Sequence, residues 1–198
     1  IRPERNQAVT ADTSRLPVQD RFNHLFTIIS SQRFLNKQGL GNEVPFFICP
    51  FKAAEAVEME RLRQRLINRL EQTGIQILEI NLYDLAIAIL KERGIWEQIL
   101  EEENSYDKVQ LKELLQGVLD PETHLVPAIA DKMAGTDFDI LFLSGVGEVF
   151  PYIRSHNVLN NLQSTAKEKP TVMFFPGDYT QSLESGASLD LFGRLHDD

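Results

Sequence analysis

The chain has 198 residues, and its 42% hydrophobic and 25% charged residues are typical of one globular domain rather than a disordered chain. A formal net charge of −9 repels phosphate backbones, and no cluster of lysine and arginine offsets it, so direct nucleic-acid binding is not expected. The single cysteine, Cys49, cannot form an intramolecular disulfide. No apolar run approaches the roughly 20 residues that cross a bilayer, so we expect a cytoplasmic protein without a membrane segment.

The N-terminal residues 1–18 are polar and lack hydrophobic periodicity, which predicts a flexible extension before a single domain over 19–198. Apolar residues at helical spacing then predict a helix over 20–31. A short apolar run over 44–49, closed by Pro50, is typical of a buried strand.

A strand–helix–strand unit follows from the next two patterns. Apolar residues at steps of three and four predict a helix over 53–72, which Thr73 and Gly74 end. The β-rich run 75–80 predicts the second strand. Strands joined in this way are parallel, with a right-handed crossover.

The middle of the chain is predicted to be helical and to form an insertion between the second and third strands. Its expected helices cover 81–93, 95–103, 108–119 and 125–134. After Asp120 and Pro121 end the third of these helices, the fourth has the weakest pattern.

The C-terminal third returns to strands that alternate with helices. Strands are predicted over 139–143 and 171–175, and a helix over 150–163 joins them. A loop over 185–188 precedes a short helix or strand over 189–195. The whole order of elements predicts an α/β fold, with a mostly parallel sheet of about four to five strands and helices on both faces.

The most informative segment is the glycine turn after the third strand, which we expect to open the helix over 150–163. Strand ends that meet helix starts are where α/β proteins bind ligands. Asparagine and histidine are poor helix formers, so propensity does not explain their number in this helix. These polar side chains either tie down neighbouring loops or contact a partner or ligand, and both readings stay open. The candidate binding residues are Gly145, Gly147, Glu148, Arg154, Ser155, His156, Asn157, Asn160, Asn161, Gln163, Asp178 and Arg194.

Motifs for catalysis are missing from the sequence. After the first strand, Lys52 is present but the glycines and hydroxyl of a phosphate-binding loop are not. Gly145 and Gly147 form half of a dinucleotide fingerprint, with Phe150 at the third glycine position. Ser144 ends the strand where an ATPase carries acidic residues. We hypothesise a degenerate, catalytically dead core like that of P-loop NTPases.

Other chemistry is not signalled either. The four histidines have no zinc-ligand spacing, and no nucleophile elbow occurs. We therefore predict no cofactor, no metal site and no catalytic residue, and we expect a protein that is not an enzyme.

Several segments, in colinear order over about residues 20–198, resemble the BrxB component of BREX bacteriophage-exclusion systems. The segments that carry the resemblance are 39–46, 125–130, 143–151, 154–163, 174–179 and 191–198. Residues 1–18 lie outside it.

The resemblance implies a bacterial antiviral defence protein rather than a metabolic enzyme. BREX systems mark host DNA by adenine methylation and block phage DNA replication through several proteins, including a methyltransferase, a large ATPase and a PglZ-type alkaline-phosphatase-fold protein. Because the family brings no catalytic residues, it implies a non-catalytic interaction and assembly role, with the PglZ-type protein as the first candidate partner. The alternative is a cryptic nucleotide- or nucleic-acid-binding protein that uses the turn from Gly145 to Gly147 and the following helix.

Overall fold

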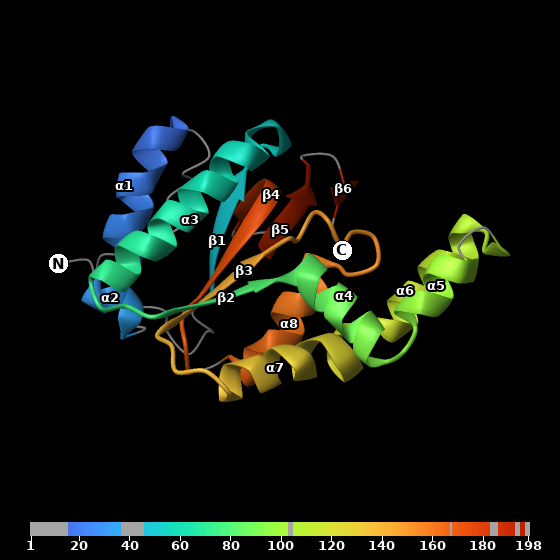
Figure 1. Cartoon of the computed structure of the whole chain (residues 1–198). Helices are drawn as coiled ribbons and strands as arrows, with labels where there is room; N and C mark the ends of the chain where they lie inside the picture. The colour runs from blue at the N-terminus through green and yellow to red at the C-terminus, as the bar shows by residue number, and fades with distance from the viewer. Residues whose placement is uncertain are drawn as a thin grey trace.

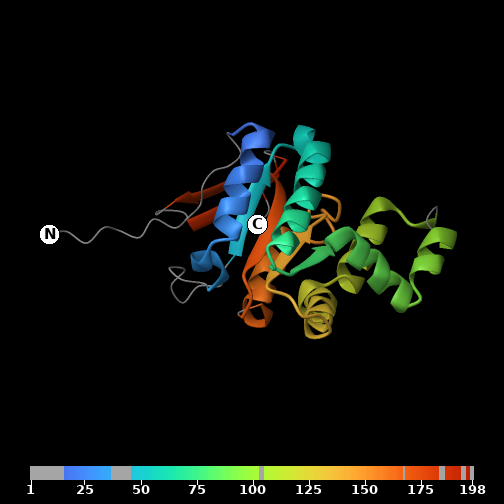
Figure 2. The same ribbon diagram turned by 60° about the vertical axis from the view of Figure 1, so that its left-hand side comes forward.

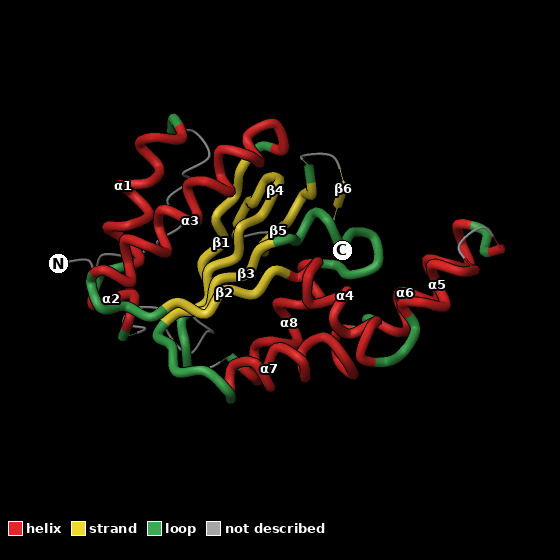
Figure 3. The backbone as a smooth tube through the Cα atoms, viewed as in Figure 1, coloured by secondary structure: helices red, strands yellow, loops and turns green. Residues whose placement is uncertain are grey.

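The computed structural model describes residues 16–36, 46–102, 105–166, 168–182, 186–192 and 195–196, and the structural statements below refer to these residues. At its centre is a parallel sheet with the strand order β2-β3-β4-β1 (Figures 1 and 3). The strands are β1 (Phe46–Phe51), β2 (Ile77–Asn81), β3 (Ile140–Ser144) and β4 (Thr171–Ser182). The predicted α/β fold with a mostly parallel sheet is confirmed.

Helices cover both faces of the sheet, as predicted (Figures 1 and 2). Successive side chains of a strand point to opposite faces, so each strand contributes to two cores. In β3, Ile140 and Phe142 join the core beneath α1 and α3, whereas Leu141 and Leu143 join the core beneath α4, α7 and α8. The bounds of these helices are α1 (Val18–Ile29), α3 (Ala56–Gln72), α4 (Leu82–Glu92), α7 (Val126–Ala134) and α8 (Ser155–Thr165).

The predicted helical insertion between the second and third strands is also present. Two of its helices, α5 (Trp96–Glu102) and α6 (Lys108–Val118), project away from the sheet and form what we call the arm (Figure 2). A π-helical turn, η4 (Pro121–Leu125), leads from the arm into α7. The sequence did not predict two short helices. These are α2 (Gln32–Leu35), which follows the predicted helix 20–31, and η2 (Ala53–Glu55), which lies at the start of the predicted helix 53–72.

The first strand continues through the proline that was expected to close it. β1 includes Pro50, which lies opposite Phe175 of β4. Among the described strands, β1 pairs with β4 alone and is therefore an edge strand. A proline at an edge can leave the ladder intact because its missing N–H group can face away from the neighbouring strand. Residues 37–45, which include the start of the predicted strand 44–49, lie outside the described residues.

The C-terminal strands extend beyond the prediction. β4 does not stop at Phe175 but runs to Ser182, and its second half pairs antiparallel with β5 (Gly186–Leu191). The loop predicted over 185–188 is therefore wrong from Gly186 onward, because a returning partner strand supplies the hydrogen bonds that the local pattern did not reveal. Of the short helix or strand predicted over 189–195, the strand is correct up to Leu191. A further strand, β6 (Leu195–His196), pairs with β5.

The helix predicted over 150–163 starts five residues late, so the glycine turn does not open it. Residues 145–154 form a loop of turns that contains a cis peptide bond between Phe150 and Pro151, and α8 begins at Ser155. Pro151 disfavours helical backbone angles at the residue before it, Phe150, where the helix was predicted to start. The apolar residues Val149 and Ile153 are buried and anchor the loop in the core, which gave this segment a helix-like pattern.

At the N-terminus, α1 begins at Val18, inside the predicted extension 1–18; residues 1–15 lie outside the described residues. Among the helices that the structure describes, none combines the length and the apolar character needed to span a bilayer.

Candidate functional site

Gly145 holds the glycine turn against the start of α4. Its φ of 73° lies in the left-handed region, and a Cβ atom there would overlap the side chain of Asn81 and lie 3.1 Å from the backbone nitrogen of Tyr83. Asn81 caps α4, since its Oδ1 accepts hydrogen bonds from the backbone N–H groups of Tyr83 at 2.9 Å and Asp84 at 3.3 Å. Position 145 therefore requires glycine because a larger residue would collide with Asn81 at the start of α4.

Gly147 has a similar packing role on the other side of the turn. A Cβ atom at this position would lie 2.8 Å from Pro176 Cγ and 3.0 Å from Phe192 Cζ. Both glycines thus admit the protein's own side chains at the strand ends, where a phosphate-binding loop would admit a ligand.

A hollow of about 200 Å³ lies at the carboxyl ends of β1 and β3, beside the middle of β4, and we call it the strand-end hollow. Apolar side chains dominate it, and Ser144 also lines it with an Oγ that is buried and has no hydrogen-bond partner among the described residues. Its lining includes Phe51, Met59, Arg63, Gly145, Gly147, Glu148, Phe174, Pro176 and Phe192.

The turn after β1 carries an acidic side chain where a P-loop protein would hold phosphate. Glu55 Oε2 accepts a hydrogen bond from the Lys52 backbone N–H at 3.2 Å. The Arg21 guanidinium, whose side chain is 1% exposed, donates to both Glu55 oxygens at 2.9 and 3.2 Å. Burial raises the pKa of the Glu55 carboxyl, but these hydrogen bonds outweigh it and leave the pKa below its ordinary value. The negative charge of the Glu55 carboxylate at this position repels phosphate. This is compatible with the hypothesis of a degenerate P-loop-like core.

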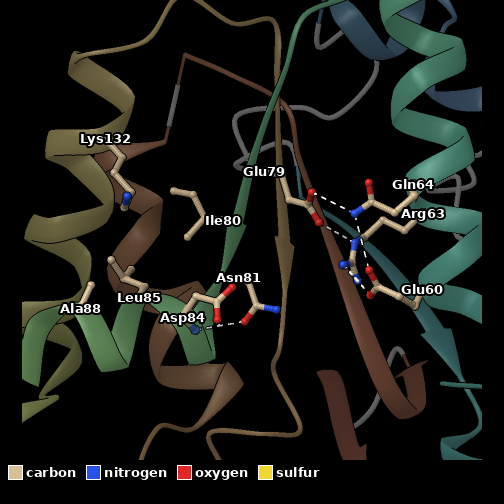
Figure 4. Close-up of a pocket in the computed structure, with 10 residues that line it drawn as sticks. All are labelled: Glu60, Arg63, Gln64, Glu79, Ile80, Asn81, Asp84, Leu85, Ala88 and Lys132. Atoms are coloured by element: carbon tan, nitrogen blue, oxygen red, sulfur yellow. Dashed lines mark hydrogen bonds and ion pairs between the residues drawn. The ribbon is translucent and has the colours of Figure 1, made fainter. Parts of the chain in front are cut away.

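A second, polar hollow of about 380 Å³ lies beside β2, between α3 and α4 (Figure 4). Arg63 donates from Nε to Glu79 Oε1 at 2.6 Å and pairs with Glu60 Oε2 at 2.5 Å. Gln64 adds a hydrogen bond to the other Glu79 oxygen at 3.4 Å. Arg63 faces two carboxylates, so the group keeps one net negative charge. No group of three or more potential metal ligands occurs in the described part of the chain.

The candidate residues on α8 contact one another along the helix. Asn161 donates from Nδ2 to the Asn157 carbonyl at 2.8 Å, and the Asn160 amide lies 3.3 Å from His156 Nε2. Ser155, another candidate residue, is 2% exposed. Because both hydrogen-bonded contacts lie within α8, they leave open whether its polar side chains tie down loops or contact a partner.

The ten candidate residues whose side chains the structure describes do not line one common hollow. Gly145, Gly147 and Glu148 line the strand-end hollow, whereas the α8 residues line none of the hollows described for this part of the chain. Arg154 is half-buried at the N-cap of α8, and Asp178 is exposed on β4. The side chain of Gln163 and the whole of Arg194 lie outside what the structure describes.

An apolar groove of about 350 Å³ lies between the arm and the body of the protein, and sequence reasoning missed it. We call it the arm groove. Tyr83 and Leu100 are 44% and 55% exposed although they are large and apolar. The local pattern carries no signal of this groove, because adjacent apolar residues such as Leu66 and Ile67 of α3 can both be buried on one helix face. The lining comprises Tyr83, Ala86, Ile87, Leu90, Trp96, Ile99, Leu100, Leu111, Leu115, Leu119, Glu148, Val149 and Tyr152.

These features define an α/β protein with strand ends packed by its own side chains and an apolar groove beside a helical arm. The sequence profile described as BREX protein BrxB matches residues 78–198. A BREX protein BrxB from Bacillus cereus (strain H3081.97) is 32% identical over 188 residues, which cover 91% of this chain and 93% of the relative. The chain therefore belongs to the BrxB family of BREX proteins, which confirms the resemblance.

A second relative, a BREX protein BrxB from Escherichia coli O9:H4 (strain HS), is 29% identical over 160 residues, which cover 81% of this chain and 79% of the relative. No solved structure matches the chain significantly.

Proposed function

We propose that this chain is a non-catalytic component of a BREX phage-defence complex that docks another BREX protein through the arm groove. The first candidate partner is the PglZ-type alkaline-phosphatase-fold protein, and the methyltransferase and the large ATPase are the others. The groove includes Glu148, which belongs to the candidate residues after the third strand, together with Val149 and Tyr152. Membership of the BrxB family supports the assignment to a BREX system.

The observation that carries the proposal is the composition and exposure of the arm groove. Tyrosine and tryptophan are the residues most often found at binding hot spots, and the groove contains Tyr83, Trp96 and Tyr152. Exposed apolar surface of this kind marks interaction sites in soluble proteins. A hydrogen bond from Gln116 Nε2 to the Pro151 carbonyl, at 3.2 Å, links α6 to the loop on the other side of the groove. The surface is thus held in shape before a partner binds.

The strand ends support docking over catalysis. Asn81, Pro176 and Phe192 pack against the two glycines, and Glu55 occupies the turn after β1. Active sites of α/β proteins lie at the carboxyl ends of the strands, and these side chains fill part of that space at β1 and β3.

Co-purification from cells that express the whole BREX system tests this proposal. Leu100→Asn changes an exposed groove residue, and Val57→Asn changes a residue of α3 that is 66% exposed and lies outside the groove. We expect the tagged wild-type chain and Val57→Asn to retain a BREX partner, and Leu100→Asn to lose most of it. If the wild-type chain captures no BREX protein, or if the two variants behave alike, the proposal fails.

One observation favours the alternative of nucleotide binding, namely the unpartnered Ser144 hydroxyl in the strand-end hollow. Calorimetric titration with ATP, GTP and short DNA at low salt distinguishes the two functions. We expect no binding heat. A heat that disappears in Ser144→Ala would favour the alternative and contradict the docking proposal's claim that the strand ends serve internal packing.

A further inference from the structure

We infer that the arm groove accepts an amphipathic α-helix of the partner, with basic residues along the flank that faces α5. This inference rests on the proposed docking function and adds the chemistry of the segment that docks. Three properties of the groove lead to it: the helix ridges that form its walls, the apolar rim outside it, and the charge of α5.

The groove is lined by apolar residues at helical spacing. On α4, Tyr83, Ala86, Ile87 and Leu90 line it at positions i, i+3, i+4 and i+7, which lie on one face of the helix. Leu111, Leu115 and Leu119 continue the pattern along and just beyond α6 at steps of four. Tyr83 is exposed and Ile87 and Leu111 are half-buried, whereas the other four are buried. Side chains at this spacing form ridges that pack into the grooves of another helix, so a helix with apolar residues three and four apart complements these walls.

The apolar surface extends past the groove itself. Leu100 on α5 and Val109 on α6 are 55% and 63% exposed, and Val109 does not line the groove. A small ligand would fill the hollow and leave this rim in water. An apolar helix of several turns covers both, which is the helix-in-groove mode of recognition.

The negative charge of α5 determines which charge the facing flank of the incoming helix must carry. This helix, Trp96–Glu102, carries three glutamates and no basic residue. Glu102 accepts hydrogen bonds from Tyr106 and Gln98, whereas Glu97 and Glu101 have no hydrogen-bond or ion-pair partner among the described residues. Unpaired carboxylates beside an apolar groove favour a partner with lysine or arginine at matching positions.

The charges near the groove set the orientation of the docked helix. Lys91 lies over the Trp96 ring, with Nζ 5.7 Å from the ring centre, and so is already engaged. Lys108 and Lys112 of α6 are balanced by Glu113 and by Asp107 at its N-cap. The α5 side is therefore acidic whereas the α6 side has no net charge, so the basic flank of the docked helix faces α5.

Two synthetic peptides of about 18 residues, five helical turns, test the inference by fluorescence anisotropy. Both carry leucines at positions i, i+3, i+4 and i+7; one has lysines on the flanks and the other has glutamates. A third peptide has the lysine composition with its leucines scrambled around the helix. We expect the lysine peptide to bind best and Leu100→Asn to abolish its binding.

Charge reversal on the protein separates site-specific from general attraction. Glu97→Lys with Glu101→Lys changes α5, and Glu58→Lys with Glu71→Lys makes the same change in net charge on exposed positions of α3. We expect the α5 pair to weaken binding of the lysine peptide about three- to tenfold more than the α3 pair. Equal effects of the two pairs, or equal binding of the scrambled peptide, would overturn the inference.

The same variants in co-purification distinguish this inference from the proposed function. If Leu100→Asn loses the BREX partner but the α5 charge reversal keeps it at low salt, docking stands and the basic helix is wrong. If light scattering shows a dimer of the wild-type chain that Leu100→Asn makes monomeric, a second copy occupies the groove and the inference is overturned.

Discussion

Gly145 lies directly against the side chain of Asn81, so the glycine turn after β3 is fitted to the cap of α4. This contact links two strand ends that are neighbours in the sheet, because Asn81 of β2 lies opposite Ser144 of β3. The turn that looked like part of a phosphate site therefore has a structural duty, and its replacement should cost stability first.

We predict that Gly145→Ala lowers the free energy of unfolding by about 2–3 kcal/mol. A left-handed backbone costs a non-glycine residue about 1–2 kcal/mol, and displacement of Asn81 weakens a helix cap worth about 1 kcal/mol. Gly117→Ala is the control, since it lies in α6 with nothing within 4 Å of a built Cβ atom, and should stabilise by about 0.5–1 kcal/mol. Urea unfolding followed by circular dichroism measures both. Equal stabilities would show that the turn can move away from Asn81.

The buried Arg21 should be another stabilising residue. Its Nε donates to the Leu16 carbonyl at 2.8 Å, and its guanidinium pairs with Glu55. Arg21→Met should lower the free energy of unfolding by about 2–4 kcal/mol, since it leaves the carboxylate without its partner. Arg61→Met, at an exposed position of α3, should change it by less than about 0.5 kcal/mol. A similar loss in both variants would contradict a specific role for the buried pair.

The same ion pair predicts a pH dependence. Because the pKa of Glu55 in the folded protein is below its ordinary value of 4.5, its contribution is present above that value and is lost as the pH falls through the lower, folded value. Arg21→Met removes the main favourable hydrogen bond and leaves the burial that raises the pKa. The stability difference between wild type and Arg21→Met should therefore shrink on acidification below pH 4.5, in urea unfolding curves at several pH values. A constant difference would refute the assignment.

Thr171 offers a test of an unused hydroxyl. Its side chain is fully buried in β4, and its Oγ1 has no hydrogen-bond partner among the described residues. Thr171→Val keeps the shape and should leave stability unchanged or raise it by about 1 kcal/mol. Thr73→Val is the matched control, since Thr73 Oγ1 donates to the Leu70 carbonyl at 2.7 Å, and its loss should cost up to about 1 kcal/mol. A large loss at Thr171 would reveal a hydrogen bond that the structure lacks.

Local patterns predicted most helices and strands because burial of one face imposes a period on each element. The patterns failed where pairing with a strand that is distant in the sequence determines whether a residue belongs to a strand. Pro50 stays within β1 because that strand is at the edge of the sheet, and Gly186 lies in β5 because β4 continues far enough to pair with it. Ser155 was named as a candidate binding residue of a helix predicted to start at residue 150, whereas it is the buried first residue of α8.

The candidate site shows the same division. The sequence alone determined the α/β class, the parallel strands, the helical insertion and the family, since these depend on periodicity and on runs of residues. The tertiary structure decided that Gly145 and Gly147 receive Asn81 and Phe192, and that Arg21 neutralises Glu55. It also brought α4, α5, α6 and the loop at Tyr152 together around one groove. Such contacts join residues that are distant in the chain, and only the order of the strands and the packing of the helices place them side by side.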